Sequence, residues 1–166
     1  MDFATRYDFL KTSIARFDRY YNLAAVKGSL LLTSNAVFLA PAVGPDSVWS
    51  RLATHGGATV VLTIASTGLS LVSVGFAALV IASYLTRSKP QPERPSLAFT
   101  EGVAHASLHD YRQGIADLSE EAIIDELAQL AHLLASNLTT KFVYVNLSLA
   151  TLIGAILTAI AAMLLA

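Results

Sequence analysis

His105 and His109 stand four residues apart, so a helix through them would present both imidazoles on one face. Such a pair could begin a zinc site, but no carboxylate follows it at a diagnostic spacing. We therefore interpret both side chains as ordinary surface histidines, and we predict no metal ion and no bound cofactor.

The patterns that carry catalysis are also missing from this sequence. It has no cysteine, which removes thiol nucleophiles and disulfides. We find no glycine-rich phosphate loop, no paired acids in an apolar setting, and no serine in a nucleophile elbow. The net charge of -1 provides no basic field for nucleic acid. We predict that the protein is not an enzyme and does not bind nucleic acid.

Lys27 and Asn35 interrupt an otherwise apolar stretch, 23–43. Lys27 lies near the start of that stretch, where its aliphatic stem can reach the membrane interface. Asn35 is deeper, and a polar group within a membrane is by default a functional candidate. The alternative, which we favour, is a hydrogen bond to a neighbouring helix that contributes about 0.5–2 kcal/mol.

The run 58–85 contains no charged residue and no histidine. The other segments are placed by the side of this run on which they lie. As a helix it would reach about 42 Å, against a hydrocarbon core of roughly 30 Å. The whole chain is 54% hydrophobic and 14% charged, whereas soluble domains average about 45–50% and 25%. The run therefore predicts a transmembrane helix.

A further long helix is predicted at the end of the chain. Ser119 is a plausible N-cap, and Glu120 and Glu121 suit the first turn of a helix. Apolar residues then recur every three or four positions, and 142–166 contains no charge. We expect one helix that leaves the cytosol and enters the membrane.

Small residues suggest where helices or subunits pack, because they let backbones approach closely in lipid. Gly68 and Gly75 are seven residues apart and share a helix face. A second stripe with steps of four consists of Ala150, Gly154, Thr158 and Ala162. We expect contacts along these stripes and a homo-oligomer.

The predicted fold class is an all-α membrane protein with three transmembrane helices. The expected segments are an N-terminal amphipathic helix 1–22, a first span 23–43, an external loop 44–57, a second span 58–85, a cytoplasmic connector and helical region 86–141, and a third span 142–166. Lysines and arginines number five before residue 44, one in the loop, and five in 86–141, which accounts for all 11. The positive-inside rule then predicts a cytoplasmic N-terminus and an external C-terminus.

The order of these parts resembles the transmembrane effectors of Pycsar (pyrimidine cyclase) anti-phage systems in bacteria, the PycTM-like family. The pieces that carry the resemblance are Ala25-Val26-Lys27-Gly28-Ser29, the 58–85 run, Lys89-Pro90-Gln91-Pro92-Glu93-Arg94-Pro95, Leu118-Ser119-Glu120-Glu121, and Lys141-Phe142. The resemblance implies a partner cyclase that makes cyclic CMP or cyclic UMP on phage infection. It also implies that the effector impairs the inner membrane and stops growth.

A nucleotide phosphate would need cationic partners near the cytoplasmic face. The available cations are Arg87, Arg94, Arg112 and Lys141, with Tyr111 and Phe99 as surfaces on which a base could stack. For any single one of these cations, the competing interpretation is that it only sets the orientation of the chain in the membrane. Two other functions stay open: a constitutive holin-like pore, and a structural or scaffold subunit of another membrane protein. The oligomer number, the nucleotide, and the kind of membrane lesion also stay open.

Overall fold

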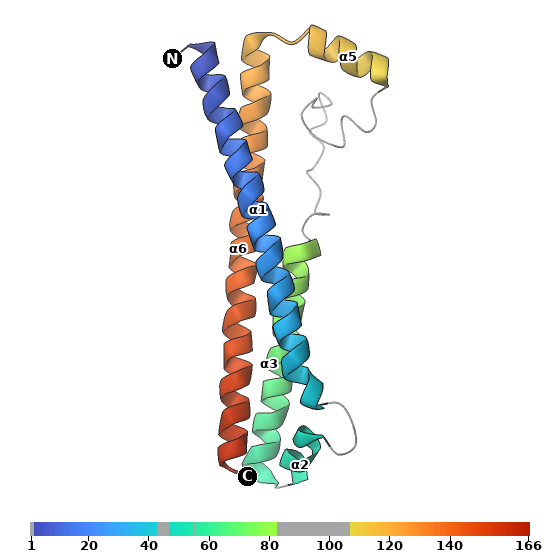
Figure 1. Ribbon diagram of the computed structural model, residues 1–166, viewed down its shortest axis with the longest axis vertical. Coiled ribbons are helices and arrows are strands. Elements are labelled where there is room, and N and C mark those ends of the chain that lie inside the picture. Colours follow the sequence, from blue (N-terminus) through green and yellow to red (C-terminus); the bar gives the residue numbers. More distant parts are fainter. Residues whose placement is uncertain (1, 43–46, 55, 83–106) are drawn as a thin grey trace. The chain divides into compact units, whose positions relative to one another are not determined.

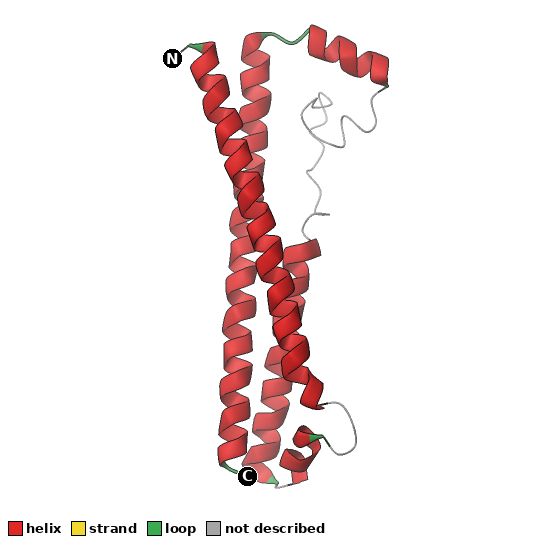
Figure 2. Ribbon diagram, viewed as in Figure 1, coloured by secondary structure: helices red, strands yellow, loops and turns green. Residues whose placement is uncertain are grey.

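The computed structural model describes residues 2–42, 47–54, 56–82 and 107–166, and the regular elements in these ranges are all helices (Figures 1 and 2). Three helical segments are long and apolar enough to cross a membrane: Phe3–Ala42, Gly57–Ala82 and Glu120–Leu164. The predicted fold class, an all-α protein with three transmembrane helices, is confirmed. The chain divides into two compact units: Met1–Asn22 with Leu85–Thr139, and Leu23–Tyr84 with Thr140–Ala166.

Helix α1 runs without a break from Phe3 to Leu39. The amphipathic helix and the first span, predicted as separate segments that meet after residue 22, form one helix of 37 residues. Asp2 caps its start, because the Thr5 backbone N–H donates to Asp2 Oδ1 at 3.3 Å. Hydrogen bonds from Thr5, first from its hydroxyl and then from its backbone, lower the pKa of the Asp2 carboxyl from its usual value.

The first unit contains the N-terminal part of α1, helix α5 (Leu108–Ala116) and the N-terminal part of α6 (Glu120–Leu164). The expected N-cap of α6 is confirmed, since the Ala122 N–H donates to Ser119 Oγ at 3.2 Å. Ala131 and Leu138 are buried on α6, and Tyr21 is buried on α1. These three buried residues are apolar, as the amphipathic pattern of both helices predicts.

The second unit begins with the C-terminal part of α1 and the short 3-10 helix η1 (Ala40–Ala42). The segment expected as a plain loop, 44–57, contains helix α2 (Val48–Thr54). Ser47 caps α2, because its hydroxyl accepts the Ser50 N–H at 3.1 Å. Trp49 anchors α2 by meeting the Phe38 ring edge-on, with 5.5 Å between ring centroids. Burial of this tryptophan gives a local reason for α2 to form.

Helix α3 (Gly57–Ala82) runs antiparallel to the neighbouring parts of α1 and α6 within the second unit (Figure 1). On all three helices the buried positions recur at alternating steps of three and four residues. That spacing is the signature of left-handed, coiled-coil-like helix packing. The buried positions are Ala24, Gly28, Leu31 and Asn35 on α1, Thr59, Thr63, Ser66, Ser70, Ser73, Ala77 and Val80 on α3, and Lys141, Val145, Ser148, Leu152, Ala155, Ala159 and Ala162 on α6.

Candidate functional site

A layer of hydrogen-bonded polar side chains lies between the three helices of the second unit, and Asn35 of α1 is at its centre. Asn35 Nδ2 donates to Ser73 Oγ of α3 at 2.9 Å and to the backbone oxygen of Leu31 at 2.8 Å. Ser70 Oγ donates to Asn35 Oδ1 at 2.8 Å. Both ends of the amide therefore have partners, which is what burial of a polar group in an apolar surrounding requires.

Ser73 and Ser148 extend the layer from α3 to α6. Each hydroxyl donates to the backbone oxygen of the other residue, at 2.8 and 2.9 Å, and the two Oγ atoms are 3.0 Å apart. Two turns away, Ser66 Oγ donates to the Ala155 backbone oxygen at 2.7 Å. We call the side chains of Asn35, Ser70, Ser73 and Ser148 the polar layer. All four are fully buried.

Small residues make this layer possible, because a hydroxyl reaches a carbonyl on another helix only if the backbones come close. Gly28 shows how close α1 and α3 are: a Cβ at this position would lie 3.1 Å from Val80 Cγ1 and 3.6 Å from the Ala77 backbone oxygen. Gly28 and Val80 pair at one level, and Asn35 and Ser73 pair seven residues further along each antiparallel helix. The close contact at Gly28 therefore lies one seven-residue repeat away from Asn35 and helps to hold the Asn35 amide within reach of Ser73.

The two lysines of the second unit have different surroundings. Lys27 is exposed, with Nζ at 5.8 Å from the centroid of the Phe142 ring, a cation–π distance. Lys141 is fully buried on the inward face of α6. The two residues of the Lys141-Phe142 pair therefore point in different directions. Phe142 faces Lys27, and Lys141 faces the interior.

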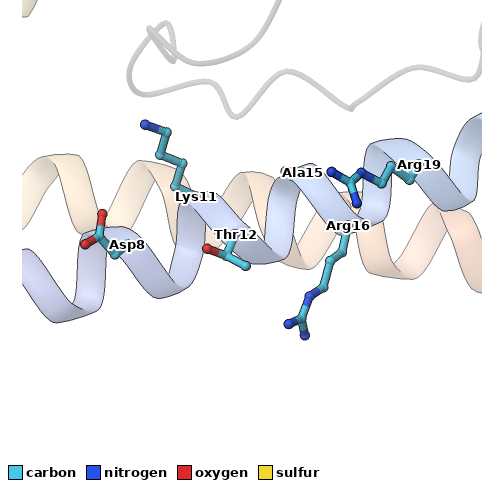
Figure 3. A pocket seen from close by; sticks show the side chains of 6 residues that line it. All are labelled: Asp8, Lys11, Thr12, Ala15, Arg16 and Arg19. Carbon is cyan, nitrogen blue, oxygen red and sulfur yellow. The ribbon is translucent and has the colours of Figure 1, made fainter.

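The described part of the first unit gathers cations along one face of α1. A shallow hollow on this helix is lined by Asp8, Lys11, Thr12, Ala15, Arg16 and Arg19 (Figure 3). Lys11 and Arg16 extend in different directions from the helix and do not converge on one point (Figure 3). Since all six residues come from a single helix face opposite its apolar side, this is a solvated cationic face.

The residues predicted to contact a nucleotide are distributed differently. Arg112 is exposed on α5, and Tyr111 beside it is half-buried. Lys141, as noted, is inside the second unit. Arg87, Arg94 and Phe99 lie outside the described residues, and so does His105. Among the residues that are described, no three His, Asp or Glu side chains gather where they could hold a metal ion.

The predicted small-residue stripes coincide only in part with the packing inside the chain. Gly68 and Gly75 are on the exposed face of α3, and a Cβ on either would have no neighbour within 4 Å. Of the second stripe, Ala162 is buried, Gly154 and Thr158 are half-buried, and Ala150 is exposed. Contacts of the exposed positions with another subunit stay a prediction.

Ser70, Ser73 and Ser148 were not predicted from the sequence to join Asn35 in one layer. Of the small residues in α3, only Gly68 and Gly75 were named as packing positions, and no serine was paired with α6. The available signal was the alternating spacing of three and four residues, which aligns 66, 70 and 73 on one face of α3 and 141, 145 and 148 on one face of α6.

Comparison with known proteins adds one finding to this geometry. A family model described as PycTM, a Pycsar effector protein domain, matches residues 9–166. That match includes every member of the polar layer. No curated protein and no solved structure matches the chain.

Proposed function

The chain belongs to the PycTM family of Pycsar anti-phage effectors, and from this membership we propose that a cyclic pyrimidine nucleotide, cyclic CMP or cyclic UMP, switches it to a state that impairs the bacterial inner membrane. Family membership implies a cyclase partner in the same system. In this proposal the cyclase supplies the nucleotide on infection, the effector does no catalysis, and the membrane damage stops growth.

The polar layer is the observation that carries the proposal. The three helices of the second unit meet through small side chains and through hydrogen bonds among Asn35, Ser70, Ser73 and Ser148. Each such bond contributes about 0.5–1.5 kcal/mol net, so the closed arrangement is stable but not locked. When the helices separate, water or another copy of the chain can supply replacement partners. A ligand with higher affinity for the separated state would then shift the population toward it.

Ligand recognition is assigned to the cytoplasmic segment between the second and third spans. Arg112 is exposed there and can meet a phosphate, while Tyr111 offers a ring for base stacking. Arg87 and Arg94 are proposed partners from the sequence alone. Lys141 is proposed to act only after the helices move, because its side chain is now fully buried.

Location and assembly complete the proposal. We place the protein in the inner membrane, where the distribution of lysine and arginine favours a cytoplasmic N-terminus and an external C-terminus. One set of three helices encloses little space, so several copies associate to make the lesion, in contact with the lipid bilayer.

Membrane potential in bacteria that express this protein tests the function directly. We expect depolarisation when cyclic CMP or cyclic UMP is supplied and none with cyclic AMP or without nucleotide. Only the activating ligand should shift the population from the closed to the separated state. A voltage-sensitive dye in whole cells makes the measurement. Depolarisation under every condition would support a constitutive pore instead, and no depolarisation under any condition would favour a scaffold subunit.

A charge reversal at Arg112 tests the ligand site. We expect Arg112→Glu to weaken the response to nucleotide by roughly tenfold or more, since a phosphate contact becomes a repulsion. The dose of nucleotide that gives half-maximal depolarisation is the readout. Arg16→Glu, an equal charge change on the exposed face of α1, is the matched control. A loss of response in the control with a normal response in Arg112→Glu would move the ligand site to α1.

A further inference from the structure

Asn146 places an amide on the exposed face of α6, within the third apolar run. It is two residues from Ser148, which is about 3 Å along a helix axis. Asn146 therefore lies at nearly the same depth as the polar layer, but it points away from the buried face of its helix. The second unit thus carries two amides at one level, with Asn35 in its interior and Asn146 on its exposed surface.

Two other polar side chains near this level, Ser34 and Thr151, hydrogen-bond to their own helices. Ser34 Oγ donates to the Leu30 backbone oxygen at 2.9 Å, and Thr151 Oγ1 donates to the Leu147 backbone oxygen at 2.8 Å, each on its own helix. Asn146 makes no hydrogen bond through its side chain to any residue in the described ranges. An amide has two donor hydrogens and an acceptor oxygen, so one bond to its own helix would not satisfy it.

Lipid chains cannot supply the missing partners, and a polar group left unsatisfied in hydrocarbon costs several kcal/mol. A second copy of the chain can supply them. Copies inserted in the same direction bring Asn146 to the same depth, and an amide is complementary to another amide because each both donates and accepts. Ala150, one turn further along, has a short side chain that lets a second α6 approach.

We propose that α6 carries the subunit interface of this protein, with Asn146 of neighbouring parallel copies hydrogen-bonded to one another in the membrane. The apolar neighbours Val143, Ala150 and Ile153 form the surrounding contact, and all are exposed in the single chain. This interface rests on the proposed association of several copies and names the surface they use. It also assigns Ala150 of the second small-residue stripe to a contact between subunits.

Cysteine cross-linking tests the interface in membranes that contain the full-length chain, which has no cysteine of its own. Ala150→Cys places a thiol on the proposed interface, and Val37→Cys places one at a similar depth on the exposed face of α1. After oxidation, we expect covalent dimers from Ala150→Cys and monomers from Val37→Cys. Dimers from Val37→Cys with none from Ala150→Cys would overturn the interface while leaving the assembly of copies in place.

A second pair of variants tests Asn146 itself. In the Ala150→Cys background, Asn146→Leu should lower the association constant about 3- to 30-fold, whereas Asn146→Gln should keep it near the parent value. Thermal unfolding in detergent should be unchanged, because the Asn146 side chain is exposed and makes no hydrogen bond to a described residue of its own chain. Equal cross-linking of the leucine variant and the parent would overturn the proposal. The membrane-potential response, measured in the same cells, reports separately whether the effector function stands.

Discussion

Gly28→Leu is expected to separate α1 from α3 and to leave little correctly folded protein in the membrane. The first carbon of any side chain at this position would lie 3.1 Å from Val80 Cγ1, and Val80 is itself fully buried. Overpacking of this kind costs about 1–3 kcal/mol for small insertions, and leucine adds three further carbons. Thermal unfolding of the purified protein in detergent, followed by circular dichroism, measures the effect.

A double-mutant cycle identifies the cause of that effect. Gly28→Ala alone should destabilise the fold, and Val80→Ala in the same chain should restore much of the loss by making room. Gly75→Ala is the matched control, since a Cβ there meets nothing within 4 Å. Alanine is also the better helix former, by about 1 kcal/mol, so the control should be neutral or slightly stabilising. A stable Gly28→Ala protein without compensation would contradict this account of the α1–α3 contact.

Asn35→Ala is expected to depolarise the membrane without any nucleotide. The substitution removes the hydrogen bonds that Asn35 makes with Ser70 and Ser73 and leaves a void at the centre of the layer. Hydrogen bonds between membrane helices average about 0.6 kcal/mol and reach about 1.7, so this loss destabilises the closed arrangement by roughly 1–3 kcal/mol. A shift of that size raises the open population about 5- to 150-fold. Membrane potential in cells without the cyclase is the measurement.

Ser34→Ala provides the comparison for that experiment. Ser34 is the chain neighbour of Asn35, but its hydroxyl is exposed, and within the described ranges it bonds only the Leu30 carbonyl of its own helix. We expect this variant to behave like the parent in both resting potential and response to nucleotide. If Asn35→Ala folds normally and its resting potential matches that of Ser34→Ala, the polar layer does not control the closed state.

Much of the architecture was predictable because charge is unevenly distributed along the chain. The run 58–85 and the uncharged end 142–166 could only be long apolar helices, and Ser119 with two glutamates marked where α6 begins. The continuity of α1 was harder to see. The charge pattern changes after residue 22, which suggested a boundary, yet no proline or other helix breaker stands there and the backbone continues. A helix can pass from water into lipid without any change in its backbone geometry.

By itself, the sequence determined that three helices are apolar enough to span the membrane and that Lys27 and Asn35 interrupt the first of them. It also carried the resemblance to the effector family that the family model confirms. Only the tertiary structure decided which face of each helix is inside. In a span without charges both faces are apolar enough for lipid, so hydropathy cannot distinguish them, and the choice depends on how small and polar groups on three helices fit together. The serines of α3 therefore packed inside and its glycines outside. For the same reason Asn35 has partners within the chain, whereas Asn146, an identical side chain, has none among the residues that the structure describes.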